Sequence, residues 1–374
     1  MIARRLLPWV ALVLTAPFGW MACSTLLGIE EPELRAPPPV ADTGVPPEEA
    51  GCVPATWPEP PTSEDTADAD VSFIVALRSV GLSTDPPNPV TGFDLDGWCT
   101  CPAPEACKPR DPDAGRHCDE PNGQDLSLNR DVLKVITQSP SFSPDRLNAD
   151  MTKGKYGILA EVRGYNGGLD DRVVEVSVFL SSGTTSDAGP SWDGGDPWDL
   201  DPSSLASDGG PPASRFVDTS AYVRGGVLVA SKLGGVKLVL GTGPESIELL
   251  LSQAVMTAKI VKRPSGYALE NGVIAGRWPT RNILTAIAPL NAPFLGVPLC
   301  SDSAKVAYNY AKLTVCNAAD LSSNPSRDKD RGADCDALSF ALQFAAEPAS
   351  FGVLRVKPVP DGGCTGWVDD CNKP

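Results

Sequence analysis

The chain has 374 residues, with 31 basic and 47 acidic side chains and a net charge of −16 at neutral pH. Nucleic-acid binding needs clustered Lys and Arg against phosphate, so this composition argues against a nucleic-acid partner, and the same charge disfavours anionic lipid headgroups. The length allows one large domain or two, and 35 Gly with 38 Pro suit many short strands joined by turns.

The N-terminus has the layout of an export signal. Arg4 and Arg5 precede an apolar run from Leu6 to Ala22. A membrane-spanning helix is the rival interpretation, but it needs about 20 apolar residues, and this run is shorter and contains two prolines. The tetrapeptide Trp20-Met21-Ala22-Cys23 resembles the bacterial lipobox, although Trp20 stands where that motif usually has Leu. The resemblance implies a signal peptide over residues 1–22 and a diacylglyceryl thioether on Cys23.

Residues 23–70 are predicted to be a tether. Proline runs stiffen this segment, and its Glu and Asp side chains keep it solvated. Ser24, rather than Asp, follows the lipidated cysteine, which by analogy with enterobacterial sorting favours the outer membrane. We therefore expect a cell-envelope protein anchored in the membrane by two or three acyl chains, which hold where a single chain would not.

Strand-like runs separated by turn signals begin at Val71. We predict strands at Val71–Leu77, Tyr156–Val162, Arg172–Leu180, Phe216–Arg224, Val227–Lys232, Val236–Leu240, Tyr267–Leu269 and Gly272–Gly276. The run Ile247–Ile260 is ambiguous, because its length allows a helix while its Val, Thr and Ile residues suit a strand.

A stretch in the middle of the chain suggests a ligand site. Four carboxylates, Asp193, Asp196, Asp199 and Asp201, share a Gly/Pro loop with Trp192 and Trp198. Calcium takes several oxygens from a flexible loop, and sugars stack on aromatic faces, so this loop is the predicted calcium and glycan site. A solvated surface loop with one Trp folded inward is the alternative. A second acidic patch, Asp94-Leu-Asp96-Gly97, is a weaker calcium candidate.

The pattern changes at Pro279. Thr280 could cap a short helix that ends before Pro289, and Asp302 or Ser303 could cap a second one. Strands return at 338–345 and 352–356. Because strands lie on both sides of this helical insertion, at about residues 280–325, we predict a single domain over residues 71–374.

The 11 cysteines constrain the fold. Without the lipidated Cys23 ten remain, and export makes disulfides their default state. They form two groups of five: Cys52, Cys99, Cys101, Cys107 and Cys118, then Cys300, Cys316, Cys335, Cys364 and Cys371. Since each group is odd, complete pairing within the chain requires at least one bridge between the groups.

Each cysteine group also has a local interpretation. The first group predicts a disulfide-held loop module. Zinc is its rival, but a Cys-x-Cys start fits poorly with the roughly two to four residues that separate paired zinc ligands. In the second group, Cys300, Cys316 and Cys335 would staple the two helices, while Cys364 and Cys371 could close a local loop.

No catalytic set stands out. The only His, His117, is predicted to be an exposed loop residue, and the sequence has no Gly-x-Ser-x-Gly elbow, HExxH, P-loop or dinucleotide fingerprint. Paired carboxylates for glycoside hydrolysis remain open, but nothing singles out a pair.

Three segments carry a resemblance. They are similar to blocks in a group of predicted myxobacterial lipoproteins without a known activity: Phe93-Asp-Leu-Asp-Gly-Trp-Cys-Thr-Cys101, Glu161-Val-Arg-Gly-Tyr-Asn-Gly167 and Gly272-Val-Ile-Ala-Gly-Arg-Trp-Pro-Thr280. In addition, Leu27–Glu31 is similar to the mature N-terminus of these lipoproteins. The resemblance implies kinship and an envelope location, but no activity.

Together these features predict a mainly β protein, a jelly-roll-like β-sandwich with a disulfide-rich N-terminal loop module and a small helical insertion near the C-terminus. We expect a lipid-anchored, non-catalytic module that binds a glycan or an envelope protein, with no cofactor unless calcium assists. A carboxylate-based hydrolase and a purely structural envelope component are the alternatives.

Overall fold

The computed structural model describes residues 53–63, 70–85, 89–101, 106–114, 117–137, 142–186, 188–206, 212–243, 246–292, 295–356, 364 and 366–372. These residues belong to one compact unit, Glu49–Pro374. The predicted signal peptide, the predicted lipidation site Cys23, Cys52 and the first part of the predicted tether lie outside the described residues. None of the helices in the described ranges is long and apolar enough to cross a membrane.

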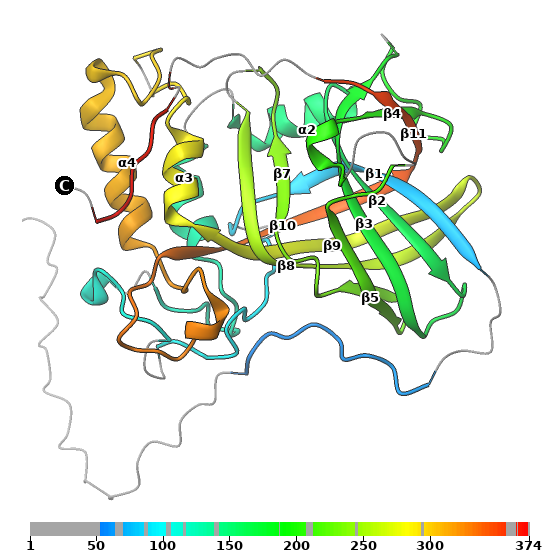
Figure 1. The fold of residues 1–374 in the computed structure, drawn as a ribbon, viewed down its shortest axis with the longest axis horizontal. Helices are drawn as coiled ribbons and strands as arrows, with labels where there is room; N and C mark the ends of the chain where they lie inside the picture. The colour runs from blue at the N-terminus through cyan, green and yellow to red at the C-terminus, as the bar shows by residue number, and fades with distance from the viewer. Residues whose placement is uncertain are drawn as a thin grey trace, which may run out of the picture. The chain divides into compact units, whose positions relative to one another are not determined.

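Eight antiparallel strands form a closed barrel (Figure 1). In ring order they are β1 (Val71–Gly81), β2 (Gly157–Tyr165), β3 (Asp171–Thr184), β5 (Phe216–Arg224), β6 (Val227–Ala230), β8 (Ile247–Arg263), β9 (Gly266–Pro279) and β10 (Ala337–Pro348), which pairs back with β1. The ambiguous run at 247–260 is a strand, β8, and the two short runs predicted at 267–276 are one strand, β9.

The pairing of β3 with β5 closes the ring. β3 pairs with β2 along one edge and with β5 along the other, where Val174 lies opposite Ala221 and Val178 opposite Phe216. The prediction of a mainly β fold is confirmed, but the predicted sandwich is wrong. Alternating side chains show that one face of each strand is buried, and this holds equally for a sandwich and for a barrel.

Apolar side chains fill the inside of the barrel. An eight-stranded barrel is just wide enough for side chains to fill it. Its strands contribute to one continuous buried cluster that includes Val75, Ile158, Val176, Val223, Leu228, Met256, Ile274 and Phe340. The inside of the barrel is therefore a packed core, which leaves its ends and outer surfaces as the places where functional groups can lie.

Three further strands extend the sheet beyond the ring. β7 (Val236–Leu240) pairs with the first part of β8, while β4 (Pro197–Leu200) pairs with the end of β3 and, in parallel, with β11 (Ser350–Leu354). β8 pairs with β7 through its first part and with β6 further along. Its pairing with β9 shifts register between these two parts, from Ser252 to Val255, where Gln253 has a φ of 52°. Such a bulge bends a strand and re-aims it.

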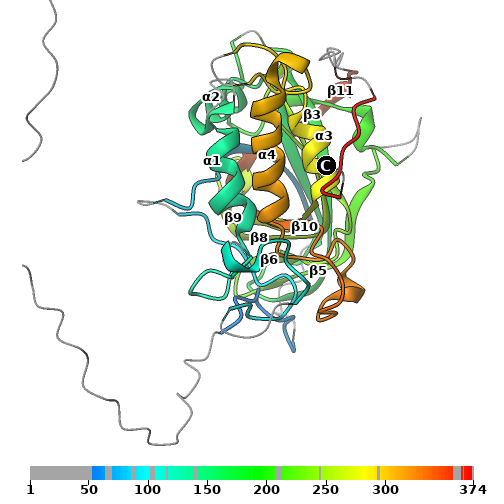
Figure 2. The ribbon, with the colours of Figure 1, turned by 90° about the vertical axis from the view of Figure 1, so that its left-hand side faces the viewer.

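Helices lie at one end of the barrel (Figures 1 and 2). A π-helical turn (Leu128–Val132) leads into α1 (Leu133–Ile136), and α2 (Pro144–Thr152), α3 (Thr280–Ile287) and α4 (Lys305–Asn317) follow. Short 3-10 turns occur at Pro112–Ala114, Pro202–Ser204, Asp302–Ala304 and Pro325–Arg327. The predicted helical insertion is confirmed by α3 and α4, whereas α1 and α2 were not predicted.

Four disulfides are described, and one of them joins the two cysteine groups. The bridges are Cys101–Cys118, Cys107–Cys335, Cys300–Cys364 and Cys316–Cys371, and Cys99 is disulfide-bonded as well. Cys107–Cys335 confirms the bridge required by the odd group sizes. The predicted staple between Cys300, Cys316 and Cys335 is wrong, as is the Cys364–Cys371 loop. These cysteines instead attach the helices to the C-terminal segment and the loop module to the barrel.

Candidate metal centre

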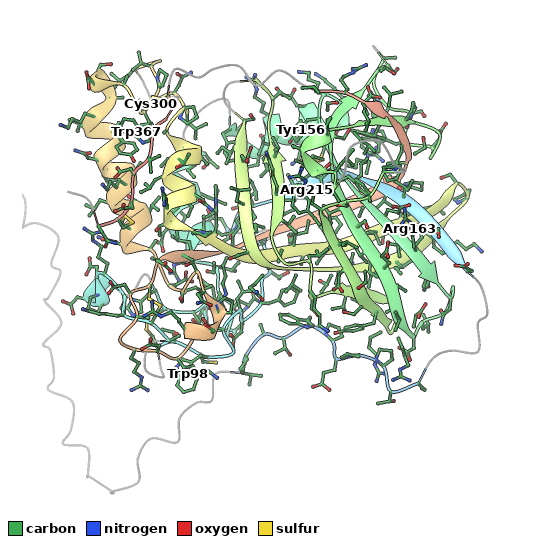
Figure 3. The ribbon with its side chains drawn as sticks, in the orientation of Figure 1. Trp98, Tyr156, Arg163, Arg215, Cys300 and Trp367 are labelled. Atoms are coloured by element: carbon green, nitrogen blue, oxygen red, sulfur yellow. A yellow bond between two sulfur atoms is a disulfide. The ribbon has the colours of Figure 1, made fainter. Side chains whose placement is uncertain are left out.

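The loop module packs on the outer face of the barrel. We use this name for the described residues 89–101, 106–114 and 117–126, which lie between β1 and the π-helical turn. Val90, Phe93 and Leu126 cover Val273 and Ala341 of β9 and β10 in a separate apolar cluster. Figure 3 labels Trp98 within this module. The disulfides and this apolar contact hold a segment that has little regular structure of its own.

Residues from the predicted tether join the same packing. Trp57 meets Phe93 edge to face, with ring centroids 5.5 Å apart. The amide of Ala55 donates to the Gly123 carbonyl at 2.9 Å, and its carbonyl accepts from the Asp94 amide at 2.8 Å. The folded unit therefore includes residues 53–61, which lie before the predicted boundary at residue 70.

Three carboxylates converge inside the loop module. Asp94, Asp96 and Asp125 each offer an oxygen that lies within 4.8 Å of the other two. Asp94 and Asp125 are buried, and Asp96 is half-buried. None of the ion pairs between described residues includes any of the three. Three acidic groups are therefore gathered without an ion-pair partner in the part of the chain that the structure describes.

Backbone amides fix the orientation of these carboxylates. Asp94 Oδ1 accepts from the amides of Gly97 at 2.6 Å and Trp98 at 3.1 Å, and Asp96 Oδ1 accepts from the Trp98 amide at 2.8 Å. Asp125 Oδ2 accepts from the Leu95 amide at 2.7 Å, which ties it to the same turn. The other oxygen of Asp94, Oδ2, is buried and has no hydrogen-bond partner among the described residues.

An arginine from the barrel holds this turn in place. Arg277 of β9 is 1% exposed, and its guanidinium pairs with both oxygens of Asp328 at 2.6 Å. The same guanidinium donates to the Leu95 carbonyl at 2.7 Å. The residue between Asp94 and Asp96 is thus fixed directly to the barrel wall, which gives the acidic turn a rigid support.

A second set of polar contacts anchors the Asp125 side. Ser127 donates its amide to Ser339 Oγ at 2.8 Å, and Ser339 Oγ donates to the buried Asp320 at 2.5 Å. Asn129 exchanges hydrogen bonds with the backbone of Ala341 at 2.7 and 3.0 Å. Both contacts join the π-helical turn to β10, so strands β9 and β10 position opposite sides of the carboxylate cluster.

Burial and nearby negative charges raise the pKa values of Asp96, Asp119 and Asp125. Burial, followed by the negative charge of Asp94, raises the pKa of Asp96 to about 8. Burial likewise raises the pKa of Asp119 to about 7, and it raises the pKa of Asp125 well above its usual range, with the charges of Asp320 and Asp119 adding to the effect. Burial thus opposes the ionisation of Asp96, Asp119 and Asp125.

The predicted site at residues 192–201 is not formed as expected. Trp198 is 1% exposed and lies in a core cluster under β4 and β11. Trp192 packs on Trp198 at 5.3 Å between ring centroids, with the Arg78 guanidinium 5.5 Å from its ring centre. The ring of Trp198 is therefore not available for stacking on a sugar, and that of Trp192 is already engaged on two sides.

The four carboxylates of that loop serve separate partners. Asp196 accepts from the Trp192 amide at 2.6 Å, Asp193 from the Gly195 amide at 3.0 Å and Asp201 from the Ser203 amide at 2.8 Å. Asp199 is buried and pairs with Arg355 at 3.0 Å. Among the described residues, the groups of side chains close enough to share a metal do not include these four. The calcium arrangement predicted for them is therefore absent from the described structure.

His117 and its neighbouring cysteines do not form a thiolate site. His117 is buried, not exposed as predicted, and its Nε2 lies 3.5 Å from Cys101 Sγ. Cys101 and Cys118 are joined as a disulfide. Because zinc needs deprotonated thiolates, the disulfide removes the zinc alternative at these two cysteines.

No known protein family matches the sequence, and no curated protein or solved structure matches the chain. The resemblance to myxobacterial lipoproteins thus stays a prediction. The sequence did contain a signal for the carboxylate cluster, since Asp94-Leu-Asp96-Gly97 has the acidic turn pattern of a cation loop. What it did not contain was the approach of Asp125, which lies 29 residues further along.

Proposed function

We propose that this chain is a lipid-anchored cell-envelope protein that acts as a non-catalytic interaction module for a protein partner. The export signal and the lipobox-like Cys23 support the location. The described disulfides support it further, because such bonds form and persist in oxidising compartments outside the cytosol.

The outward face of α4 carries the interaction part of the proposal. Val306, Tyr310 and Leu313 lie at the i, i+4 and i+7 spacing of one helical stripe, and they are 85%, 63% and 54% exposed. Single exposed apolar residues are ordinary, but a continuous stripe is typical of a contact surface. The opposite face of α4 is fixed to the fold by Cys316–Cys371 and by Lys312, which pairs with Asp369 at 2.9 Å.

The composition of α4 favours a protein partner with an apolar contact surface. The chain has 47 acidic residues, yet the helix from Lys305 to Asn317 has none; Lys305 is exposed, and Lys312 is neutralised by Asp369. An apolar face without acidic side chains lacks the charge that would attract a basic partner. Glycan binding is less well supported, because the two tryptophans predicted for it contact Arg78 and each other.

The hydrolase alternative is also less well supported. Glycoside hydrolysis places two carboxyl groups about 5 to 9.5 Å apart on either side of a sugar ring. The cluster at Asp94, Asp96 and Asp125 has carboxylate oxygens within 4.8 Å of one another and two buried members, which leaves no room for a sugar between them.

Site-specific photo-crosslinking in the native host tests the interaction surface. A benzoylphenylalanine at position 310 should give one discrete protein adduct, and the same group at position 173, where Val173 is 62% exposed on β3, should not. Val306→Ser combined with Leu313→Ser should reduce the adduct at least fivefold. Equal labelling at both positions, an adduct with glycan only, or an adduct of twice the chain mass would refute the proposal.

Intact-mass analysis tests the location independently. The mature chain should begin at Cys23 with its acyl groups, and Cys23→Ser should release the protein from membranes. A chain that keeps residues before Cys23, or that carries free thiols, would contradict the envelope assignment.

A further inference from the structure

Among the described residues, no ion pair brings a positive charge to the carboxylate cluster of the loop module. Three carboxylates meet within 4.8 Å, and the described ion pairs of the nearby arginines use other acids: Arg277 pairs with Asp328, and Arg130 with Glu120 and Asp131. Burying several carboxylates together without a counter-charge is unfavourable, because desolvation and mutual repulsion both oppose ionisation. A fold that positions them so firmly needs either protons or a cation to complete it.

The buried oxygen of Asp94 points to a missing ligand. Asp94 is 4% exposed, and its Oδ1 accepts from two backbone amides, while its Oδ2 is buried and none of the described residues donates to it. An unpaired buried oxygen is costly, and protein interiors almost always satisfy such an atom with a donor, a water or an ion. The Asp94 carboxyl group, which carries this unpaired Oδ2, lies against the carboxyl groups of Asp96 and Asp125.

The structure assigns to Asp94, Asp96 and Asp125 a calcium-binding site. The ion joins the turn that carries Asp94 and Asp96 to the segment that carries Asp125, just before the π-helical turn. The donors are all carboxylate oxygens on a non-helical loop, which suits a hard cation with flexible coordination. Calcium takes six to eight oxygens in variable geometry, whereas magnesium requires near-ideal octahedral geometry and retains its waters. The site goes beyond the interaction surface on α4 and does not depend on it.

The support around the three carboxylates suits a structural ion. Leu95 is held by Arg277, so Asp94 and Asp96 approach from a turn fixed to β9. Asp125 approaches from a segment fixed to β10 through Ser127 and Ser339. An ion bound by Asp125 and by the Asp94–Asp96 turn would link the segment held by β10 to the turn held by β9. Its binding energy would add to the stability of the folded state.

Calcium titration of the metal-stripped protein tests the site. The full chain is exported and purified with its disulfides intact, stripped with EDTA and titrated with CaCl₂ by isothermal calorimetry. We expect one calcium per chain and a rise in Tm of roughly 5 °C or more at a hundredfold excess over Kd. Magnesium should bind at least tenfold more weakly.

Matched Asp→Asn variants locate the ion. Asp94→Asn and Asp96→Asn should each weaken calcium binding at least tenfold, whereas Asp193→Asn, a control in the acidic loop at 192–201, should leave it unchanged. Asn keeps the oxygen that accepts the backbone amides, so near-UV circular dichroism should show the native fold. The site is refuted if calcium does not bind, if magnesium binds more tightly, or if only Asp193→Asn abolishes binding.

Terbium provides a test that needs no variant. Tb³⁺ substitutes for calcium, and Trp98, whose amide contacts both Asp94 and Asp96, lies close enough to sensitise its luminescence. Calcium should displace the signal with the affinity measured by calorimetry. The anomalous peak of Tb³⁺ in a crystal should lie among the three carboxylates, and a peak elsewhere in the chain would overturn the assignment.

Discussion

Removal of the Cys107–Cys335 bridge should be the most destabilising loss of any single described disulfide. This bond closes a sequence separation of 228 residues, while Cys101–Cys118 closes only 17. In the chain-entropy description, a cross-link stabilises the fold by restricting the unfolded chain, and the effect grows with the logarithm of the closed length. The bridge then contributes about 5 kcal/mol for the long loop and about 3 kcal/mol for the short one.

The quantity to measure is the difference in the free energy of unfolding between the variants that lack one bridge or the other. Absolute effects of disulfides are often smaller than this description gives, but the difference of about 2 kcal/mol depends only on the ratio of loop lengths. The variants are Cys107→Ala with Cys335→Ala, and Cys101→Ala with Cys118→Ala as the control. Each double variant removes both partners, so neither leaves a free thiol that could form a wrong bridge.

Urea unfolding without reductant measures the difference. The long-loop variant should lose about 2 kcal/mol more than the control, and its m value should rise more, because its unfolded chain expands further. An equal or smaller loss than the control would refute the entropic reasoning. It would also show that the bridge between the two cysteine groups adds little beyond the packing around it.

Three further predictions concern single residues. Trp198→Ala should destabilise the fold by about 3–5 kcal/mol in urea unfolding, because it empties a fully buried site, and a loss below 1 kcal/mol would contradict the core placement. Gly272→Ala should cost about 1–3 kcal/mol, since the added Cβ would lie 2.4 Å from the Phe344 ring, and Phe344→Leu should recover part of that loss if the clash is its cause. Burial raises the pKa of Asp369, but hydrogen bonds from Lys312 and a tyrosine hydroxyl outweigh it and leave the pKa below its usual value. The stability that Asp369 contributes is therefore present above its unfolded pKa of about 4 and is lost as the pH falls through the folded value. Asp369→Asn should flatten the acid limb of a curve of unfolding free energy against pH. An unchanged acid limb would argue against the Lys312 contact.

Local sequence patterns identified the strands well because their information is local. Phe216–Arg224 and Val236–Leu240 coincide with β5 and β7, and the helical insertion begins at Thr280 as predicted. Period-two alternation and turn residues are properties of a few neighbouring residues. The helix α1 was missed because it has only four residues, and a helix of this length depends on packing more than on its own sequence. The start of α2 does carry a local signal, the N-cap Ser143 followed by Pro144, which the strand pattern around it obscured.

The carboxylate cluster shows where local patterns stop being informative. Asp94 and Asp96 are adjacent in a turn, but Asp125 reaches them only because the loop module folds back on the barrel, with Arg277 and Ser339 supporting its two sides. At 192–201 the opposite happened. Four carboxylates close in sequence diverge, because each caps the nearest backbone amide or pairs with a distant arginine.

The sequence alone determined the mainly β character and the need for a bridge between two odd groups of cysteines, which Cys107–Cys335 satisfies, and it predicts an export address. The parity of a cysteine count is a global constraint that can be counted without knowing the fold. Only the tertiary structure decided that the strands close into a barrel, that Trp198 is buried and that Asp125 joins Asp94 and Asp96. These outcomes depend on which distant segments pair, and side-chain alternation specifies the buried face of a strand without specifying its partner.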